Sequence, residues 1–276
     1  MCKPNSYAVL VCVMLFAFNH SFAQELYVFT EPASNMPAHS LSVKQTVKSL
    51  YNKTDARNEN RYTTELMFGL NKNTMVHTTV SLSDMYSSNL HFESAKVYAK
   101  YRFLSNDAVH SHFRMSAFAE ASYSRNDPVF DEISLDGDQP GIQAGIIATQ
   151  LLHKLAISST ISWTENMQGI RWEKSFPQIV PYEAVNYSLS AGYLLFPKTY
   201  RDYNQPNLNV YVELLGQRTT GLNKYFIDIA PAVQLILNST AKINLGYRYQ
   251  LSSNMNRMSD KSWLISFEWL FLNALK

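Results

Sequence analysis

The sequence predicts one antiparallel β-barrel that spans a membrane. About twelve segments between Ser40 and the C-terminus alternate apolar with polar residues, and polar turn residues separate each segment from the next. No apolar stretch of this region is long enough for a membrane-spanning helix. A closed antiparallel sheet can still cross a bilayer, because closure pairs every backbone group.

Residues 1–23 are predicted to be a cleaved signal peptide. Lys3 supplies a positive start, residues 8–18 form a short apolar stretch, and Ser21-Phe22-Ala23 is a small-x-small cleavage site. A lipoprotein signal needs a small residue just before its cysteine. Val11 precedes Cys12 here, which argues against acylation of that cysteine. We therefore expect three parts, which are the signal peptide, an N-terminal periplasmic segment at 24–39 and the barrel at 40–276.

Cysteine content and charge exclude several classes of function. Both cysteines, Cys2 and Cys12, lie in the segment to be removed, which excludes disulfides and cysteine-based zinc sites. The chain has 24 Lys and Arg against 22 Asp and Glu, and losing Lys3 leaves 23 against 22. Such a balance gives no reason to expect a nucleic-acid partner.

The alternation is sharpest at residues 91–103 and in the last segment. In the first, apolar Ala95, Val97 and Ala99 interleave with Lys96 and Lys100, which a helix would scatter around its circumference. In the last, one parity is almost wholly aromatic: Trp263, Ile265, Phe267, Trp269 and Phe271. Period two therefore predicts strands, and the last one is suited to close the barrel.

The predicted strands are 40–51, 60–71, 73–84, 91–104, 110–124, 139–152, 154–165, 183–196, 206–217, 223–238, 240–251 and 261–272. Residues 141–157 are nearly continuously apolar and fit a buried helix as well, although two glycines and a Ser-Ser-Thr run favour two strands. Tight connections are expected after strands two, four, six and ten, including one at 105–109. Longer ones are expected after strands three, five, seven and eleven. Outer-membrane barrels have this alternation of short periplasmic turns and longer outer loops, with an even strand number.

A soluble sandwich or lipocalin-like barrel is the main alternative fold, since its strands alternate too. It would bury the apolar parity, whereas a membrane barrel turns that parity toward lipid. Strands of ten or more residues and aromatics near strand ends favour the membrane.

The opposite parity then faces the lumen and holds the candidate functional residues. They are Lys44, Lys48, Arg61, Glu65, Lys96, Lys100, Arg102, Arg114, Glu120, Glu213, Asp228, Lys242, Arg248 and Glu268. Glu65 is expected beside Lys44 and Lys48, and Glu268 between strands carrying Arg248 and Lys44. Two interpretations stay open: a salt-bridge network that fills the lumen, or a water-filled pore whose excess of basic groups attracts anions.

Three further segments lie outside the strands. Residues 127–138 hold Asp127, Asp131, Glu132, Asp136 and Asp138, which suit a solvated acidic loop better than a site for a hard divalent cation. The loop at 166–182 is rich in aromatics and proline, which suits a self-packed loop or a lid on the barrel mouth. Residues 31–39 form either an ordered linker or a plug of the periplasmic mouth.

No constellation for catalysis is evident, and no cofactor or metal is expected. His77 is the only mid-strand histidine, with Thr79 and Ser81 on its face, but no His-x-Ser-Asn-Gly or Gly-x-Ser-x-Gly arrangement is present. A barrel-wall lipid hydrolase, which would need such a histidine, is therefore the least favoured function.

In four places the chain resembles outer-membrane transporter-like barrels of Gram-negative bacteria, the group that includes phenol-degradation outer-membrane proteins and, more remotely, fatty-acid channels. These places are Phe22-Ala23-Gln24, residues 31–37 (EPASNMP), residues 141–145 (GIQAG) and the aromatic last strand. The resemblance implies passive uptake or efflux of small molecules, including hydrophobic ones. The expected partners of the barrel are outer-membrane lipid, lipopolysaccharide and the barrel-assembly machinery. Assembly signals usually end in a terminal aromatic residue, whereas five residues follow Phe271 here. The alternative is a non-conducting structural or surface-binding barrel.

Overall fold

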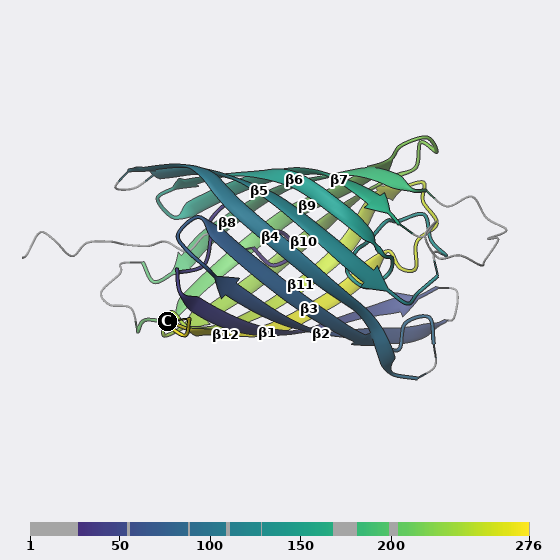
Figure 1. Cartoon of the computed structure of the whole chain (residues 1–276), viewed down its shortest axis with the longest axis horizontal. Coiled ribbons are helices and arrows are strands. Elements are labelled where there is room, and N and C mark those ends of the chain that lie inside the picture. The colour runs from purple at the N-terminus through teal and green to yellow at the C-terminus, as the bar shows by residue number, and fades with distance from the viewer. Residues whose placement is uncertain are drawn as a thin grey trace, which may run out of the picture.

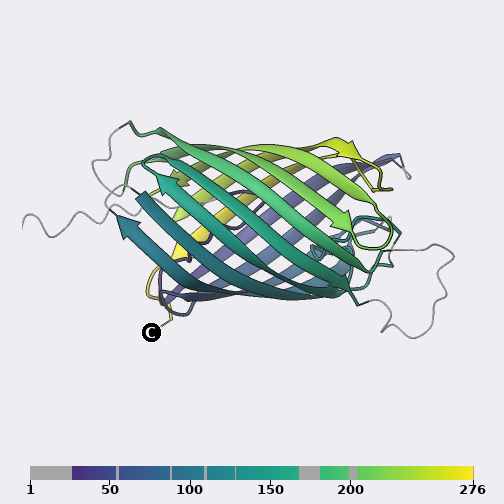
Figure 2. The same ribbon diagram turned by 90° about the horizontal axis from the view of Figure 1, so that it is seen from above.

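The computed structural model describes residues 27–53, 56–87, 89–108, 111–127, 129–167, 181–198 and 204–275. In these ranges twelve strands form one closed antiparallel barrel, in which each strand pairs with its sequence neighbours and β12 closes on β1 (Figures 1 and 2). The strands are β1 (Ser40–Asn52), β2 (Arg57–Gly69), β3 (Thr74–Ser83), β4 (His91–Ala108), β5 (Ser111–Ser124), β6 (Gly141–Leu152), β7 (Leu155–Asn166), β8 (Glu183–Phe196), β9 (Asn207–Thr219), β10 (Tyr225–Leu237), β11 (Ala241–Ser253) and β12 (Lys261–Phe271). The predicted fold class is confirmed. Among these residues no helix has the length and apolar character needed to cross a bilayer.

The structure confirms one predicted turn and contradicts another. The apolar stretch at 141–157 forms β6 and β7 around a tight turn at His153 and Lys154, as predicted, with Leu152 paired to Leu155. The expected turn at 105–109 is wrong. Residues 105–108 instead pair with 111–114 and lengthen the β4–β5 hairpin, because a register shift between Arg102 and Leu104 lets the ladder continue.

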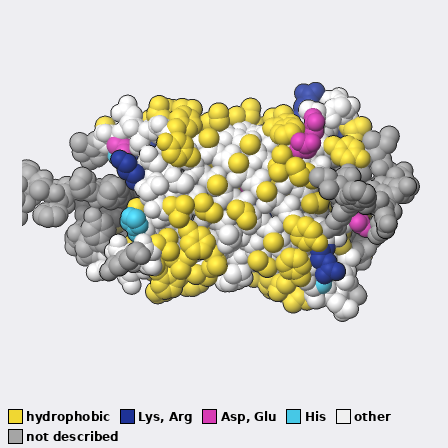
Figure 3. Space-filling model, in the orientation of Figure 1, with side chains coloured by type: hydrophobic (Ala, Val, Ile, Leu, Met, Phe, Trp, Pro, Cys, Tyr) yellow, Lys and Arg dark blue, Asp and Glu magenta, His cyan; other side chains and the backbone are white. Residues whose placement is uncertain are grey.

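The outer face of the barrel excludes the soluble alternative. On β12 the aromatic parity from Trp263 to Phe271 is 44–56% exposed, whereas Ser262, Ser266 and Glu268 of the other parity are buried. Apolar side chains cover the middle of the surface seen in Figure 3, and the charged groups on this face lie near its two ends. An apolar band between polar ends is the surface that a bilayer requires.

The two ends of the barrel differ. At the end on the left of Figure 1, here called the turn end, lie the C-terminus, the start of β1 and the ends of β2, β4, β6, β8 and β10. At the opposite end, the loop end, lie the other connections. The tail after Phe271 folds back at the turn end, where the Leu275 N–H donates to the His39 carbonyl (3.1 Å). The predicted signal peptide and most of the predicted loop at 166–182 lie outside the described residues.

Candidate functional site: the barrel interior

The chain that precedes β1 lies inside the barrel. We call residues 27–37 the lumenal segment. Its first contact is with Glu213 of β9, a fully buried carboxylate that accepts hydrogen bonds from the Val28 and Phe29 N–H groups (both 2.9 Å) and from the Thr30 hydroxyl (2.7 Å). Two main-chain donors and one hydroxyl thus satisfy a carboxylate that would otherwise be costly to bury.

The next turn of the lumenal segment is held by Lys100 of β4. Its ammonium donates to the Pro32 and Ser34 carbonyls (2.8 and 3.0 Å) and forms an ion pair with Glu31 (3.2 Å). Burial acts to raise the pKa of Glu31, but the combined attraction of Lys100, His77 and Lys44 outweighs burial and lowers that pKa below its usual value. Glu31 therefore stays ionised and paired at neutral pH.

Small hydroxyl groups of the wall bind Ala33, which lies between Pro32 and Ser34, the two residues whose carbonyls accept from Lys100. The Ala33 N–H donates to the Thr149 hydroxyl (2.9 Å), and the Ser116 hydroxyl donates to the Ala33 carbonyl (2.6 Å). Arg114 donates to the Ser34 hydroxyl (2.8 Å). The wall thus binds mostly the backbone of the segment, which fixes its path through the lumen.

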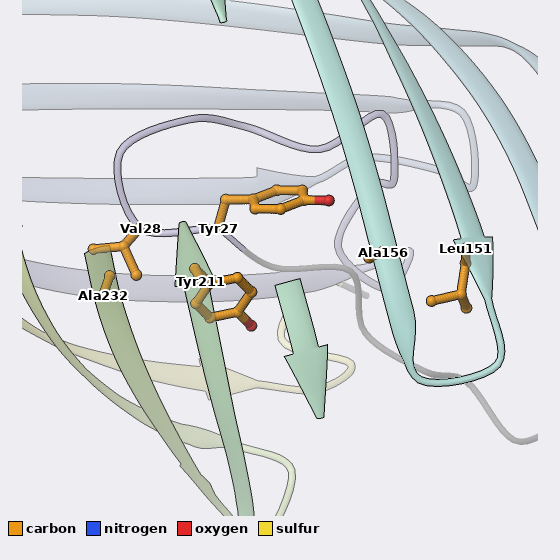
Figure 4. Packing of buried hydrophobic residues seen from close by; sticks show 6 residues of the cluster. All are labelled: Tyr27, Val28, Leu151, Ala156, Tyr211 and Ala232. Atoms are coloured by element: carbon orange, nitrogen blue, oxygen red, sulfur yellow. The ribbon is translucent and has the colours of Figure 1, made fainter. Parts of the chain in front are cut away.

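Apolar contacts complete the attachment. Tyr27 and Val28 join a buried cluster with four wall residues, Leu151, Ala156, Tyr211 and Ala232 (Figure 4). The Phe29 ring lies against Gly246 of β11, where a Cβ atom would come within 2.5 Å of the ring. Glycine at 246 thus leaves the space into which Phe29 packs.

The connection between β5 and β6 enters the lumen from the loop end. We call residues 127–138 the acidic loop. Arg61 of β2 donates to Glu93 (2.8 Å) and to Asp138 (2.6 Å), and Glu132 accepts from Arg248 (3.1 Å). Further contacts join Glu132 to Arg257 (2.8 Å), Asp136 to Lys96 and Asp131 to Lys224 (3.2 Å). The expectation of a solvated acidic loop is wrong for most of these carboxylates, because basic groups of the wall and of the β9–β10 and β11–β12 loops bind them, whereas the Asp136 side chain stays 72% exposed.

The ion pairs of the acidic loop predict its response to acid. Burial acts to raise the pKa of Glu132, but Arg257 and Arg248 outweigh it and hold that pKa well below its usual range. Lys96 lowers the pKa of Asp136 to about 2. A depressed pKa contributes stability that is present above the ordinary carboxylate value and disappears as the pH falls through the folded value.

We therefore expect the loop to stay bound from pH 7 down to about 4 and to loosen only below about 3. A dye on Ser134→Cys would report this, since the mature chain is predicted to have no other thiol. Its fluorescence anisotropy should be constant to about pH 4 and then fall. A drop between pH 6 and pH 5 would contradict this assignment of the ion pairs.

Gly137 gives the acidic loop its path. Its φ is +113°, and a Cβ atom there would lie 2.6 Å from both Arg61 Nε and Glu93 Oε2. Gly137→Ala should therefore destabilise the folded barrel by roughly 1–3 kcal/mol, from backbone strain together with the displaced ion pair. Urea unfolding in detergent micelles measures the loss. Gly221→Ala is the matched control, because Gly221 also has a positive φ but no atom near its Cβ position.

A chamber lies between the lumenal segment and the acidic loop. Its volume is about 410 Å³, and a second space of about 50 Å³, the outer pocket, lies toward the loop end. The charged residues that line the chamber are Glu31, Lys44, Lys48, Arg61, Glu65, Lys96, Glu120, Glu132, Asp136 and Arg248. The rest of the lining combines hydroxyls and amides, such as Thr46 and Gln143, with apolar side chains, such as Phe118, Ile147 and Leu215. The outer pocket shares Lys48, Arg61, Glu132 and Arg248 with it.

The candidate residues form three groups in the structure. Ion pairs join Lys44 to Glu65 (3.5 Å), Lys96 to Glu120 (3.3 Å), Lys242 to Glu268 (2.7 Å) and Arg248 to Asp228 (2.6 Å). Arg61, Lys100, Arg114 and Glu213 hold the acidic loop or the lumenal segment. Lys48 lies opposite Arg61 in the β1–β2 ladder. Arg102 lies at the turn end, where it donates to the Lys72 carbonyl (2.8 Å), and does not line the chamber.

Alternation alone misses several lumenal carboxylates. Glu93 has the parity of the lipid-facing residues, yet both Glu93 and Ser94 are buried. A register shift between Ser81 and Leu82 leaves Glu93 as an extra residue on β4 and turns it inward. Glu31 and Glu132 lie outside the strands, where period two gives no signal.

His77 lies inside the barrel, not on the lipid-facing wall. Its Nδ1 is 2.8 Å from a Glu65 oxygen, its ring centroid lies 5.0 Å from that of Tyr98, and it is 2% exposed. A residue buried on the lumen side has no access to lipid, so this placement does not support a barrel-wall lipid hydrolase. In the part of the chain that the structure describes, no three His, Cys, Asp or Glu side chains are grouped to hold a metal ion.

No protein-family model and no curated protein matches the sequence. The fold is similar to two solved porins. Against the KdgM porin the TM-score is 0.51 at 9% identity, covering 83% of this chain and 99% of that one. Against the NanC porin the TM-score is 0.52 at 9% identity, covering 83% of this chain and 98% of that one. The outer membrane phospholipase A of Escherichia coli is less similar, with a TM-score of 0.43 at 10% identity over 92% and 96% of the two chains.

The protein is an outer-membrane β-barrel with a porin-like fold. Neither of the two porins above is described as a phenol-degradation protein. That part of the predicted resemblance therefore has no support from the comparisons.

Proposed function

We propose that this barrel is a narrow channel for small polar solutes. The observation that carries the proposal is the chamber of about 410 Å³, which is lined by ten charged side chains and many hydroxyls and amides, with apolar side chains between them. A lumen that served only as a packed core would be filled, as the interiors of small barrels are. Here a solute-sized space lies between two inserted segments.

The path through the barrel follows from the shared lining of the two spaces. From the loop end a solute would enter the outer pocket and pass Lys48, Arg61, Glu132 and Arg248 to reach the chamber. The lumenal segment, including Tyr27 and Phe29, lines the chamber on the side of the turn end. Passage to the turn end therefore requires that segment to move.

The surroundings of the barrel are also proposals. The turn end would face the periplasm and the loop end the lipopolysaccharide, as in barrels with an even number of strands. The barrel-assembly machinery would insert the chain, with the aromatic β12 as the recognised strand. The short tail after Phe271 folds back toward His39 and does not extend this strand.

Planar lipid bilayers test the channel. Folded mature protein should give small, discrete conductance steps. A chain that lacks residues 27–36 should give larger steps, because the segment that blocks the turn end is gone. Folding is verified independently by the shift in gel mobility between unheated and heated samples. Silence from both proteins after verified insertion would overturn the channel.

One observation favours the alternative, a non-conducting barrel. Most charged groups of the lumen are paired with each other, so they rigidify the interior instead of offering free charge to a solute. Such a barrel would bind at its surface or stabilise the membrane. It predicts no conductance even without residues 27–36, whereas the channel predicts conductance there.

A further inference from the structure

We propose that Lys48 forms the centre of a binding position for a small oxyanion, a carboxylate or a phosphate. The proposal deepens the channel proposed above, since it names the solute class that the passage selects. Its evidence is a lumenal ammonium that, unlike its neighbours, has no carboxylate of its own.

The pairing of the lumenal bases sets Lys48 apart. Lys44, Lys96, Lys100 and Lys242 each have a carboxylate within 4.0 Å. Within the described ranges, no salt bridge or hydrogen bond involves the Lys48 ammonium, although the side chain is half-buried and lines both the chamber and the outer pocket. An ammonium removed from bulk water without a partner is stabilised by an anion that reaches it.

The neighbours of Lys48 increase the attraction. Lys48 lies directly opposite Arg61 in the β1–β2 ladder, and Arg61 and Arg248 line the outer pocket and the chamber with it. Two carboxylates, Asp138 and Glu132, also line the outer pocket, but each is bound to a guanidinium. Three basic groups, Lys48, Arg61 and Arg248, thus line this position, and the two carboxylates beside them already bind a guanidinium.

The two arginines also retain donors. Arg61 uses Nε and Nη2 for Glu93 and Asp138, and Arg248 uses Nε and Nη2 for Asp228 and Glu132. No contact with described residues involves Nη1 of either guanidinium. Planar N–H groups beside an ammonium favour the oxygen atoms of a carboxylate or phosphate over a spherical halide.

The location gives the site a role in selection. Lys48, Arg61, Glu132 and Arg248 are the residues that the outer pocket and the chamber share, so any solute that enters from the loop end passes them. An oxyanion held here would be concentrated at the entrance to the chamber. Weak binding suits this role, because a solute must also leave.

Isothermal titration calorimetry of the folded protein in detergent tests the site, with sodium acetate, sodium phosphate and sodium chloride at constant ionic strength. We expect acetate or phosphate to bind, and Lys48→Gln to weaken that binding about tenfold or more, the loss expected for one charge-assisted hydrogen bond. Lys48→Arg should retain most of the affinity. Lys154→Gln is the matched control, because it removes a lysine from the β6–β7 turn outside the chamber.

The outcomes separate this site from the channel. Equal affinity in wild type and Lys48→Gln overturns the site, and so does chloride binding as strong as that of both oxyanions. The relative affinities of acetate and phosphate identify the preferred oxyanion. Binding that depends on Lys48 in a protein without conductance would leave the site standing and overturn the channel, whereas conductance without such binding would do the reverse.

Discussion

Glu213→Ala should raise the single-channel conductance several-fold, toward that of the chain without residues 27–36. Glu213 accepts from two main-chain N–H groups and one hydroxyl of the lumenal segment. Removing the carboxylate leaves the Val28 and Phe29 N–H groups without this acceptor, whereas the Thr30 hydroxyl keeps the Ser190 hydroxyl as a partner, so the bound position of the segment loses stability. The loss of two charge-assisted hydrogen bonds at about 1.5 kcal/mol each would shift the equilibrium between bound and released segment by roughly a hundredfold.

Two variants control for other effects of this change. Glu213→Gln keeps an oxygen that can accept from the main chain, so its conductance should lie close to that of the wild type. Glu183→Ala removes a carboxylate at the loop end, where it contacts Thr220 and not the segment. If Glu213→Ala and Glu183→Ala conduct alike, the lumenal segment does not block the pore.

Arg61→Ala should produce the largest loss of stability among single changes to the lumen. The Arg61 side chain is 3% exposed, and it binds Glu93, which is fully buried, and Asp138 of the acidic loop. Removing the guanidinium leaves a buried carboxylate without compensation, for which a cost of about 3–5 kcal/mol is typical. The temperature at which the folded band disappears on a gel, together with urea unfolding, measures the effect.

The comparison with a more exposed arginine makes this test specific. Arg57→Ala also removes a guanidinium paired with a buried glutamate, Glu59, but the Arg57 side chain is 32% exposed and water can replace it. Arg61→Lys keeps the charge but loses the bidentate contact, so the stability of this variant should lie between those of Arg61→Ala and the wild type. A loss for Arg61→Ala no larger than that for Arg57→Ala would contradict the structural role assigned to it.

The strands could be predicted because barrel strands obey one simple rule. Side chains alternate between lipid and lumen, so residues such as Lys96 and Val97 report their faces directly. The rule fails where the backbone departs from regular pairing. The bulge at Ser81 and Leu82 turned Glu93 inward, and the shift between Arg102 and Leu104 extended β4 past the expected turn.

The interior was harder to predict than the wall, since the sequence does not reveal which segments outside the strands enter the lumen. The carboxylates of the acidic loop come from a stretch that looks like an ordinary solvated connection, and Glu31 belongs to a proline-containing segment that fits a linker equally well. The acidic loop lies inside because basic groups bind its carboxylates, and the lumenal segment because Glu213 and Lys100 of the wall bind it. Their charges change the balance of the lumen, which would be basic from the strands alone.

The closure of the barrel between β1 and β12 bears on the order of folding. Every other strand pair is a hairpin between sequence neighbours, so only this pair joins residues that are far apart in the chain. Its loop-closure entropy is the largest in the molecule, which makes it the expected last step of assembly. Residues 27–37 lead directly into β1 and already lie inside the wall. If β1 and β12 pair around these residues in the last step, the barrel encloses the segment as it folds. The segment then has no need to enter a barrel that is already closed.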